Sequence, residues 1–331
     1  MHRVSVILPV FNGRRFLLAA VRSVLAQSLP PCELIVVDDG STDGSLAELE
    51  GIQPPFPVRV LRQANAGQSA ARNLAACQAE GEYLAFLDQD DQWHAQHLEQ
   101  LAAALDADPA VGWAYCDFDE MDFDGNLVTR AFLRGQGVTH PKRSIFECVA
   151  ADLMVLPSAS VVRRAAFEQV GGFDEALSGY EDDDLFVRFF RLGWDHIFVD
   201  RTLLRFRIHS NGSSASRRFI DSRLRYADKL AAILPDDPRM LRYYVPDAIA
   251  PRFFFTSLDD YVRACTERDW EGARLALEAV NHFARLRRRS LRLRWKLLWI
   301  QQPRLFRMLV ALNDRLPYRA RFVRNPTVTL R

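Results

Sequence analysis

The stretch YLAFLDQDD, residues 83–91, joins a run of apolar residues to a cluster of acids. Its apolar part predicts a buried strand, which we place at Glu82 to Leu87. Asp88, Asp90 and Asp91 follow within four positions. Like charges this close repel one another, and at least one such carboxyl normally stays protonated. The cluster therefore raises the question of what compensates its charge at the end of a strand.

Strand-like and helix-like segments alternate over the first part of the chain. Short β-branched runs predict strands at Val4 to Leu8, Glu33 to Val37 and Val58 to Leu61. Apolar residues at helical spacing predict helices at Phe16 to Leu25, Gln68 to Ala79 and His94 to Leu105. This alternation predicts an α/β fold with a mostly parallel sheet that helices cover on both faces.

Ligands of such sheets bind beyond the carboxyl ends of the strands. Asp38 and Asp39 end the second predicted strand, within VVDDGSTDGS. If this strand and Glu82 to Leu87 are parallel neighbours, both groups of carboxylates gather along one edge of the sheet. We therefore expect the functional site at that edge.

The pattern changes after Pro109. Strands are predicted at Gly112 to Cys116, Leu127 to Phe132, Ser158 to Val162, Ile197 to Val199 and Leu203 to Ile208. The first two are joined by a hairpin-type turn at Asp124-Gly125. A helix is predicted over Asp182 to Leu192, and the chain from about Asp221 onward has a helical pattern. We expect one domain over residues 1–220, with halves 1–110 and 111–220, and a helical region over 221–331.

The composition narrows the class of protein. With 331 residues, of which 49% are hydrophobic, the chain can form a sizeable core. No apolar stretch is long enough to span a bilayer, and the N-terminal residues lack the pattern of a signal peptide. Five cysteines are scattered without a CxxC pair, which supports neither a disulfide framework nor a zinc site. A reducing, cytoplasmic location fits best.

Basic residues are concentrated at the C-terminal end, although the net charge of the chain is only +1. From His282 onward there are fourteen basic residues and one acid, Asp314. Tryptophan, phenylalanine and leucine residues lie among the arginines, as in basic amphipathic helices that bind anionic membranes. The alternative is a packed helical subdomain with solvated arginines. Without a recognition motif, nucleic-acid binding is not expected. We predict peripheral membrane attachment through residues 282–331.

Three motifs at the predicted edge carry groups for binding a phosphorylated ligand. Asp88 and Asp90 offer the hard oxygen ligands that suit Mg²⁺ or Mn²⁺, or they form an acidic turn that caps the next helix. Asp39 can accept a hydrogen bond from a base or a ribose, or can form an Asx turn. Arg72, in NAGQSAARN, can pair with phosphate or can be a solvated surface arginine.

Two further motifs add titratable groups. Glu181, Asp182, Asp183 and Asp184 open a predicted helix, and four acids exceed what a helix cap requires. One of them could act as a general base, or all could simply be favoured by the helix dipole. His209 ends an apolar strand, where it is either a metal ligand or a surface residue.

Taken together, seven segments resemble the family 2 glycosyltransferases, which are inverting enzymes with the GT-A fold. In chain order they are VSVILPVFNGRRFL, ELIVVDDGSTDGS, NAGQSAARN, YLAFLDQDD, GGFDEAL, YEDDDLFVR and RIHSNGSS. The resemblance covers roughly residues 3–215. It implies a GT-A domain, Rossmann-like, whose first half binds the nucleotide and whose second half binds the acceptor. The basic helical C-terminal extension lies outside it.

The resemblance also implies the residues of the donor site. Pro9 and Val10 would contact the nucleotide through their backbone, and Asp39 would bind the uracil of a UDP-sugar. Arg72 matches an arginine near the nucleotide. Asp88 matches the first acid of the DxD motif, beside the nucleotide.

The metal and acceptor sites are implied in the same way. Asp90 would be the more direct ligand of Mg²⁺ or Mn²⁺, and His209 would complete metal or diphosphate binding. Asp182 matches the expected catalytic base, with Glu181 beside it as an acceptor-binding residue. Gln89, at the middle of the DxD motif, departs from the more usual Ser or Ala.

The function implied is a metal-dependent inverting glycosyltransferase. It would move a sugar from a nucleotide-sugar, expected to be a UDP-sugar, to a hydroxyl of a glycan or lipid-linked acceptor in cell-surface polysaccharide synthesis. One alternative is a catalytically inactive nucleotide-sugar-binding scaffold, against which Asp90 and Asp182 argue. Another is a sugar nucleotidyltransferase, which would carry a Gly-rich phosphate loop where PVFNGRRFL has one glycine.

Overall fold

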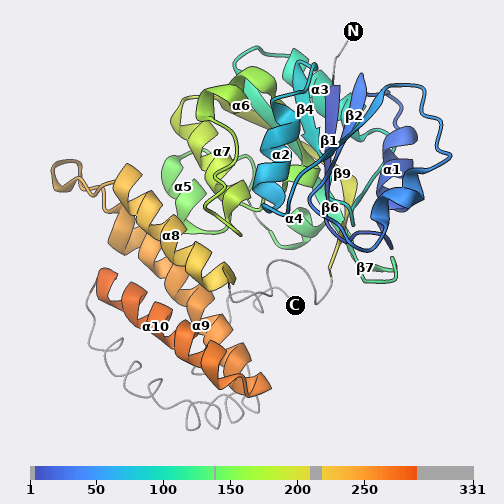
Figure 1. The fold of residues 1–331 in the computed structure, drawn as a ribbon. Helices are drawn as coiled ribbons and strands as arrows, with labels where there is room; N and C mark the ends of the chain where they lie inside the picture. The colour runs from blue at the N-terminus through green and yellow to red at the C-terminus, as the bar shows by residue number, and fades with distance from the viewer. Residues whose placement is uncertain (1–3, 138, 209–217, 289–331) are drawn as a thin grey trace. The chain divides into compact units, whose positions relative to one another are not determined.

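The computed structural model describes residues 4–137, 139–208 and 218–288. The chain divides into two compact units. The first comprises Met1–Ile145 with Leu153–Ser213, and the second comprises Phe146–Asp152 with Ser214–Arg331. A nine-stranded sheet with helices on both faces forms the first unit, and helices form the second (Figure 1).

The first four strands form the parallel half of the sheet. In spatial order they are β3 (Val58–Arg62), β2 (Glu33–Asp38), β1 (Val4–Val10) and β4 (Tyr83–Phe86). Strand β1 is buried along its whole length and pairs in parallel with both β2 and β4. Because these three strands run in the same direction, the segments that carry Asp38 and Asp88 leave the sheet at the same edge, as predicted.

Beyond β4 the sheet is mixed. Strand β8 (Ser160–Arg163) runs antiparallel to β4 and to β6 (Val111–Met121). Strand β9 (Asp195–Arg207) is parallel to β6. Two short antiparallel strands, β5 (Gln92–Trp93) and β7 (Leu127–Thr129), pair with β9 and β6. The expectation of a mostly parallel sheet therefore holds for the first half alone, because β8 runs against both of its neighbours.

Two predicted segments differ from the structure. The strands expected at Ile197 to Val199 and Leu203 to Ile208 are parts of one strand, β9, whose register against β6 shifts near Asp117. The strand expected at Leu127 to Phe132 ends at Thr129, and helix α4 (Phe132–Gly135) follows. The buried carboxylate of Asp117 accepts hydrogen bonds from two N–H groups at the start of α4, at 2.8 and 3.2 Å. This long-range cap explains why the chain turns there.

Helices cover both faces of the sheet (Figure 1). Helices α1 (Leu17–Leu25) and α3 (His97–Asp106) pack against alternate residues of β1, β2 and β4 in one core. On the other face, α2 (Gln68–Ala76) packs on β1 and β2. There α6 (Arg164–Val170) places Phe167 5.6 Å from Phe86, measured between ring centroids. Helix α7 (Glu181–Arg191) follows and packs two phenylalanines against Trp113.

The second unit is helical, as predicted for the region from residue 221. It contains α8 (Arg218–Ile233), α9 (Ala250–Glu267) and α10 (Trp270–Leu286), with most of α5 (Ile145–Ala150). Phe253 packs between Tyr226 and Phe283, with ring centroids 6.0 and 5.6 Å away. Buried Arg223 pairs with Asp260 at 2.6 Å. Helices α8, α9 and α10 therefore each contribute an aromatic side chain to one apolar core.

The predicted basic membrane-binding stretch is described only as far as Arg288. Arg288 donates hydrogen bonds from Nε and Nη2 to the carboxylate of Asp247, each at 2.6 Å. Arg287 lies over the rings of Phe254 and Phe255, at 4.6 and 5.0 Å. These two arginines thus have partners within the second unit, and residues 289–331 lie outside the described residues. No helix in the described ranges is both long and apolar enough to cross a membrane.

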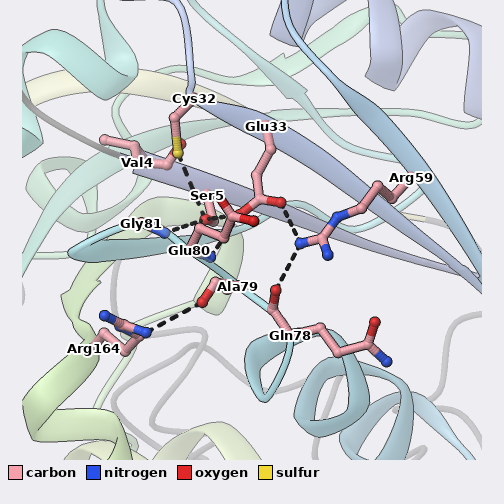
Figure 2. A network of polar contacts seen from close by, with 10 residues as sticks. All are labelled: Val4, Ser5, Cys32, Glu33, Arg59, Gln78, Ala79, Glu80, Gly81 and Arg164. Carbon is pink, nitrogen blue, oxygen red and sulfur yellow. Dashed lines mark hydrogen bonds and ion pairs between the residues drawn. The ribbon is translucent and has the colours of Figure 1, made fainter.

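A polar network fixes the sheet at the edge where its parallel strands begin (Figure 2). Glu33 is 4% exposed and accepts hydrogen bonds from Ser5 Oγ at 2.6 Å and from the Glu80 N–H at 2.7 Å. It also pairs with Arg59. Burial opposes ionisation of Glu33, but the N–H of Glu80, Ser5 and Arg59 outweigh it and lower the pKa. The charged form of Glu33 therefore stabilises the contact between β1, β2 and β3.

We expect Glu33→Gln to lower the free energy of unfolding at pH 7 by about 2 kcal/mol, because the network loses its charge. The pKa of Glu33 is lowered in the folded protein, so the wild-type advantage is present above the unfolded value of 4.5. It disappears as the pH falls through the folded-state pKa. Urea unfolding over a pH series measures the difference. The exposed control Glu82→Gln changes stability by less than about 0.5 kcal/mol. A loss for Glu33→Gln that does not shrink toward low pH contradicts this role.

Candidate active site

The loops that follow β1 and β2 are tied to each other at the carboxyl edge of the sheet. Asn12 has a left-handed backbone (φ 50°), and its Oδ1 accepts the Thr42 N–H at 2.8 Å. Its own N–H donates to Ser41 Oγ at 3.1 Å. The Gly13 N–H donates to Ser45 Oγ at 3.0 Å. These contacts fix the backbone that follows β1 against the turn that follows β2.

Pro9 and Val10, the predicted backbone contacts of the nucleotide, are the last two residues of β1 and are buried. Asp39 is the first residue after β2, and its N–H donates to the carbonyl of Val10 at 2.8 Å. This bond holds Asp39 beside the end of β1. The predicted nucleotide ligands of the first two strands are therefore neighbours in the structure.

Asp39 is 3% exposed, and its carboxylate organises the loop after β3. It accepts hydrogen bonds from Gln63 Nε2 at 2.7 Å, from the Ala66 N–H at 2.8 Å and from the Gly67 N–H at 2.9 Å. Its neighbour Asp38 accepts the Ser41 N–H, three residues on, at 2.9 Å. The Asx turn that was the alternative for this motif is formed by Asp43, which accepts the Ser45 N–H at 2.9 Å. A carboxylate has about four acceptor positions, so Asp39 retains roughly one for a base.

Arg72 lies at the centre of the site and is 1% exposed. One guanidinium nitrogen, Nη2, donates to the carboxylate of Asp88, and Nη1 lies 3.9 Å from Glu181. The guanidinium also lies over the ring of Phe173, at 5.2 Å. Burial opposes its charge, but Asp88 and Glu181, with a further contribution from Asp182, outweigh burial and raise the pKa of Arg72. The alternative of a solvated surface arginine is excluded by this burial.

Arg72 thus brings the DxD motif and the acids of α7 into one charged cluster. Among the described residues, Nε and Nη1 of Arg72 have no hydrogen-bond acceptor. Buried donors in this state are uncommon, and each needs an explanation such as a ligand.

The four acids at the start of α7 have different environments. Glu181 is buried, where it accepts hydrogen bonds from Gln68 Nε2 and, at 2.7 Å, from the Gly179 N–H. Buried Asp183 accepts the Leu153 N–H at 3.0 Å, and buried Asp184 pairs with Arg188 at 2.8 Å. Asp182 is the member of this group that retains partial exposure. Three of the acids are therefore buried, whereas Asp182 is partly exposed and accepts the Asp183 N–H at 2.7 Å.

Asp91 answers part of the question raised by the acid cluster. Its carboxylate is buried and accepts the Arg207 N–H at 2.9 Å. Burial, followed by the charges of Asp90 and Asp88, raises the pKa of Asp91 well above its ordinary value. Of the three carboxyls, Asp91 is thus the one whose neutral form its surroundings favour, whereas Arg72 compensates Asp88.

Sequence reasoning missed two residues that support this site. Arg207 Nε donates to the Asp90 carbonyl at 2.9 Å, so the end of β9 is bonded to the loop that carries the DxD motif. Asn73 pairs with the backbone of Phe173 through two hydrogen bonds of 2.9 Å, which link α2 to the GGF turn. No local pattern distinguishes Arg207 from Arg205, because its partners are far away in the sequence. Asn73 is the last residue of NAGQSAARN, one of the seven segments of the family resemblance, and could have been singled out there.

Asp88 and Asp90 are the described candidates for metal ligands. Both are partly buried, and Asp88 also pairs with Arg72. Their hard oxygen atoms fit Mg²⁺ or Mn²⁺ bound together with phosphate oxygens. Within residues 4–137, 139–208 and 218–288, no three His, Cys, Asp or Glu side chains are arranged to hold a metal by themselves. His209, the other predicted ligand, lies outside the described residues.

Comparisons with known sequences point to one family. The family model described as Glycosyl transferase family 2 matches residues 5–171. Glycosyltransferase GlyG of Streptococcus pneumoniae is 30% identical over 221 residues, which cover 62% of this chain and 71% of that protein. Glycosyltransferase TuaG of Bacillus subtilis, whose name links it to teichuronic acid biosynthesis, is 37% identical over 152 residues, or 44% of this chain and 60% of that protein. Three of the curated relatives are matched over 35%, 54% and 60% of their own length.

A comparison with solved structures agrees. S. aureus TarS 1-349 in complex with UDP-GlcNAc superposes with a TM-score of 0.66 at 19% identity. The match covers 97% of this chain and 93% of that chain. At this level of identity the likeness establishes the fold.

We expect Arg72→Met to lower the free energy of unfolding at pH 7 by about 3 kcal/mol. Methionine keeps much of the volume, but Asp88 and Glu181 lose their common cation, and breaking a buried pair in this way is costly. Urea unfolding monitored by tryptophan fluorescence measures the change. Arg22→Met, at an exposed position of α1, is the matched control and changes stability by less than about 0.5 kcal/mol. If both variants lose equally little, Arg72 does not balance the acids.

Proposed function

The chain belongs to glycosyl transferase family 2, and on this basis we propose that it is an inverting glycosyltransferase that uses a UDP-sugar donor. The family expected from the seven motifs is confirmed by the match over residues 5–171. The predicted GT-A fold with a C-terminal helical extension is confirmed by the likeness to TarS. The complex of TarS with UDP-GlcNAc supports a UDP-sugar as the donor here.

The observation that carries this proposal is the buried position of Arg72 between Asp88 and Glu181. It joins the motif expected at the donor diphosphate to the motif expected at the acceptor. A cation beside a departing diphosphate compensates the negative charge that builds up there. The donor and acceptor sites proposed for this chain therefore share one electrostatic centre.

In the proposed reaction a hydroxyl of the acceptor attacks the anomeric carbon from the face opposite to the diphosphate. A bond from the acceptor oxygen forms, the bond to the diphosphate breaks, and the configuration inverts. Asp182, the partly exposed acid of α7, takes the proton of the hydroxyl as general base. Asp88 and Asp90, with His209 as predicted, would hold Mg²⁺ or Mn²⁺, which supplies further charge neutralisation at the diphosphate when bound.

The remaining site residues are proposed as follows. Pro9, Val10 and Asp39 contact the nucleotide at the ends of β1 and β2. Glu181 lines the acceptor site beside Asp182, and its contacts with Gln68 and the Gly179 N–H fix it there. The nucleotide roles agree with the positions of Pro9, Val10 and Asp39 at one edge of the sheet.

We propose a glycan or lipid-linked acceptor that belongs to cell-surface polysaccharide synthesis. The name of TuaG supports this, because it links that relative to teichuronic acid biosynthesis. An acceptor in the cytoplasmic leaflet also agrees with the basic composition of residues 282–331, which we propose to attach peripherally to anionic lipid.

We expect Asp182→Asn to reduce turnover of the UDP-sugar by about 100-fold or more, because asparagine cannot accept the proton. The dissociation constant of UDP stays within about twofold of the wild-type value, since the fold and Arg72 are unaffected. UDP release with a panel of donors measures turnover, and calorimetry measures binding. Asp195→Asn, an exposed control at the start of β9, leaves both unchanged. Normal turnover by Asp182→Asn rules out this base.

We expect a chelator to abolish UDP release and added Mn²⁺ or Mg²⁺ to restore it. The reason is that Asp88 and Asp90 crowd negative charge where the diphosphate is proposed to bind. Added metal also increases the affinity for UDP by at least about tenfold, as measured by calorimetry. Full activity in excess chelator, or an unchanged UDP affinity on adding metal, contradicts the proposed metal site.

A further inference from the structure

Gln89, between Asp88 and Asp90, makes an unusual contact for a side chain in this position. Its Oε1 accepts the Phe11 N–H, and its Nε2 donates to the Phe11 carbonyl, both at 3.0 Å. The carboxamide therefore pairs with the backbone of Phe11 in the way that a neighbouring strand would. It joins the loop after β4 to the loop after β1.

Gly13 lies directly against this carboxamide. A Cβ atom added to Gly13 would overlap Oε1 and Cδ of Gln89, and the three nearest atoms to it all belong to the Gln89 side chain. The backbone of Gly13 is not left-handed, so its conformation does not itself require glycine. The residue is thus small because Gln89 approaches it closely.

The same loop is held on its other side by the turn after β2. Asn12 and Gly13 donate their N–H groups to Ser41 and Ser45, at 3.1 and 3.0 Å. Gln89 supplies the contact on the side of β4. Phe11 to Gly13 is therefore fixed between the two strand ends that carry Asp39 and Asp88.

We propose that Gln89 is a positioning residue for the nucleotide. It holds the Phe11 to Gly13 backbone against the DxD loop, so that the nucleoside and diphosphate parts of the donor site keep a fixed separation before the donor binds. Alanine or serine at this position is too short for either bond, whereas the carboxamide of Gln89 supplies one donor and one acceptor that reach the same peptide backbone. The inference rests on the proposed function in so far as the ligand is a nucleotide.

Three variants test this contact: Gln89→Ala, Gly13→Ala and the double variant. Gln89→Ala removes both hydrogen bonds directly. Gly13→Ala displaces the Gln89 side chain and breaks the same two bonds without changing Gln89. Because both changes act on one contact, the double variant behaves like either single variant, and the effects do not add. Gln92→Ala, a glutamine of the adjacent strand β5 whose side chain makes no hydrogen bond among the described residues, is the control.

The first readout is the affinity for UDP in the presence of Mn²⁺, measured by calorimetry. Each of the three variants is expected to bind about tenfold more weakly, because binding must now order the loop. At saturating donor, turnover changes by less than about threefold, since Asp182 and Arg72 are untouched. Unchanged affinity in Gln89→Ala, or losses in the two single variants that add in the double variant, overturn the proposal.

The second readout does not depend on any ligand. Hydrogen exchange of a peptide that contains Phe11 to Gly13 is expected to be at least about tenfold faster in all three variants than in the wild type or Gln92→Ala. The melting temperature serves to check that each variant is folded. Exchange that stays at the wild-type rate overturns the contact itself. If exchange accelerates as expected but the wild type binds no UDP, the contact stands and the proposed donor is wrong.

Discussion

The buried charge of Arg72 is the constraint on which the site depends. A guanidinium removed from water must be paired, or its burial is too costly to persist. Here the partners are Asp88, which follows β4, and Glu181, which begins α7. These two segments are far apart in the sequence, and the requirement to pair Arg72 brings them together. Asp182, next to Glu181, is thereby placed near the acids of the DxD motif.

Short polar side chains then fix the loops around this centre. Asn73 pairs with the backbone of Phe173, and Gln89 pairs with that of Phe11, each through one donor and one acceptor. In both cases a glycine lies against the amide, Gly172 in the first and Gly13 in the second. In both places a carboxamide therefore pairs with the backbone of a loop through one donor and one acceptor.

Much of the fold was predictable because its first half is encoded locally. The alternation of strands and helices up to residue 106 determined the order of the elements, and the acid pairs marked the strand ends. The later strands were less predictable because their pairing is long-range: β9 depends on its register against β6, and α4 depends on the buried carboxylate of Asp117. Nothing near these segments in the sequence shows either partner.

The site was predictable in its residue types but not in their environments. The family resemblance singled out Asp182 and Glu181 among the four consecutive acids at α7, but the burial of the other three follows from distant partners such as Leu153 and Gln68 and from Arg188. In the same way, the burial of Arg72 and the raised pKa of Asp91 depend on tertiary contacts.

We propose that Arg72 and the DxD acids form one donor site at the carboxyl edge of β1, β2 and β4. A crystal structure of the protein with UDP and Mn²⁺ tests it most directly. In that structure we expect the uracil beside Asp39, the cation at Asp90, and the diphosphate within ion-pair distance of Arg72. A nucleotide bound elsewhere, or a diphosphate at this edge that contacts neither Arg72 nor a cation held by Asp88 and Asp90, would contradict it.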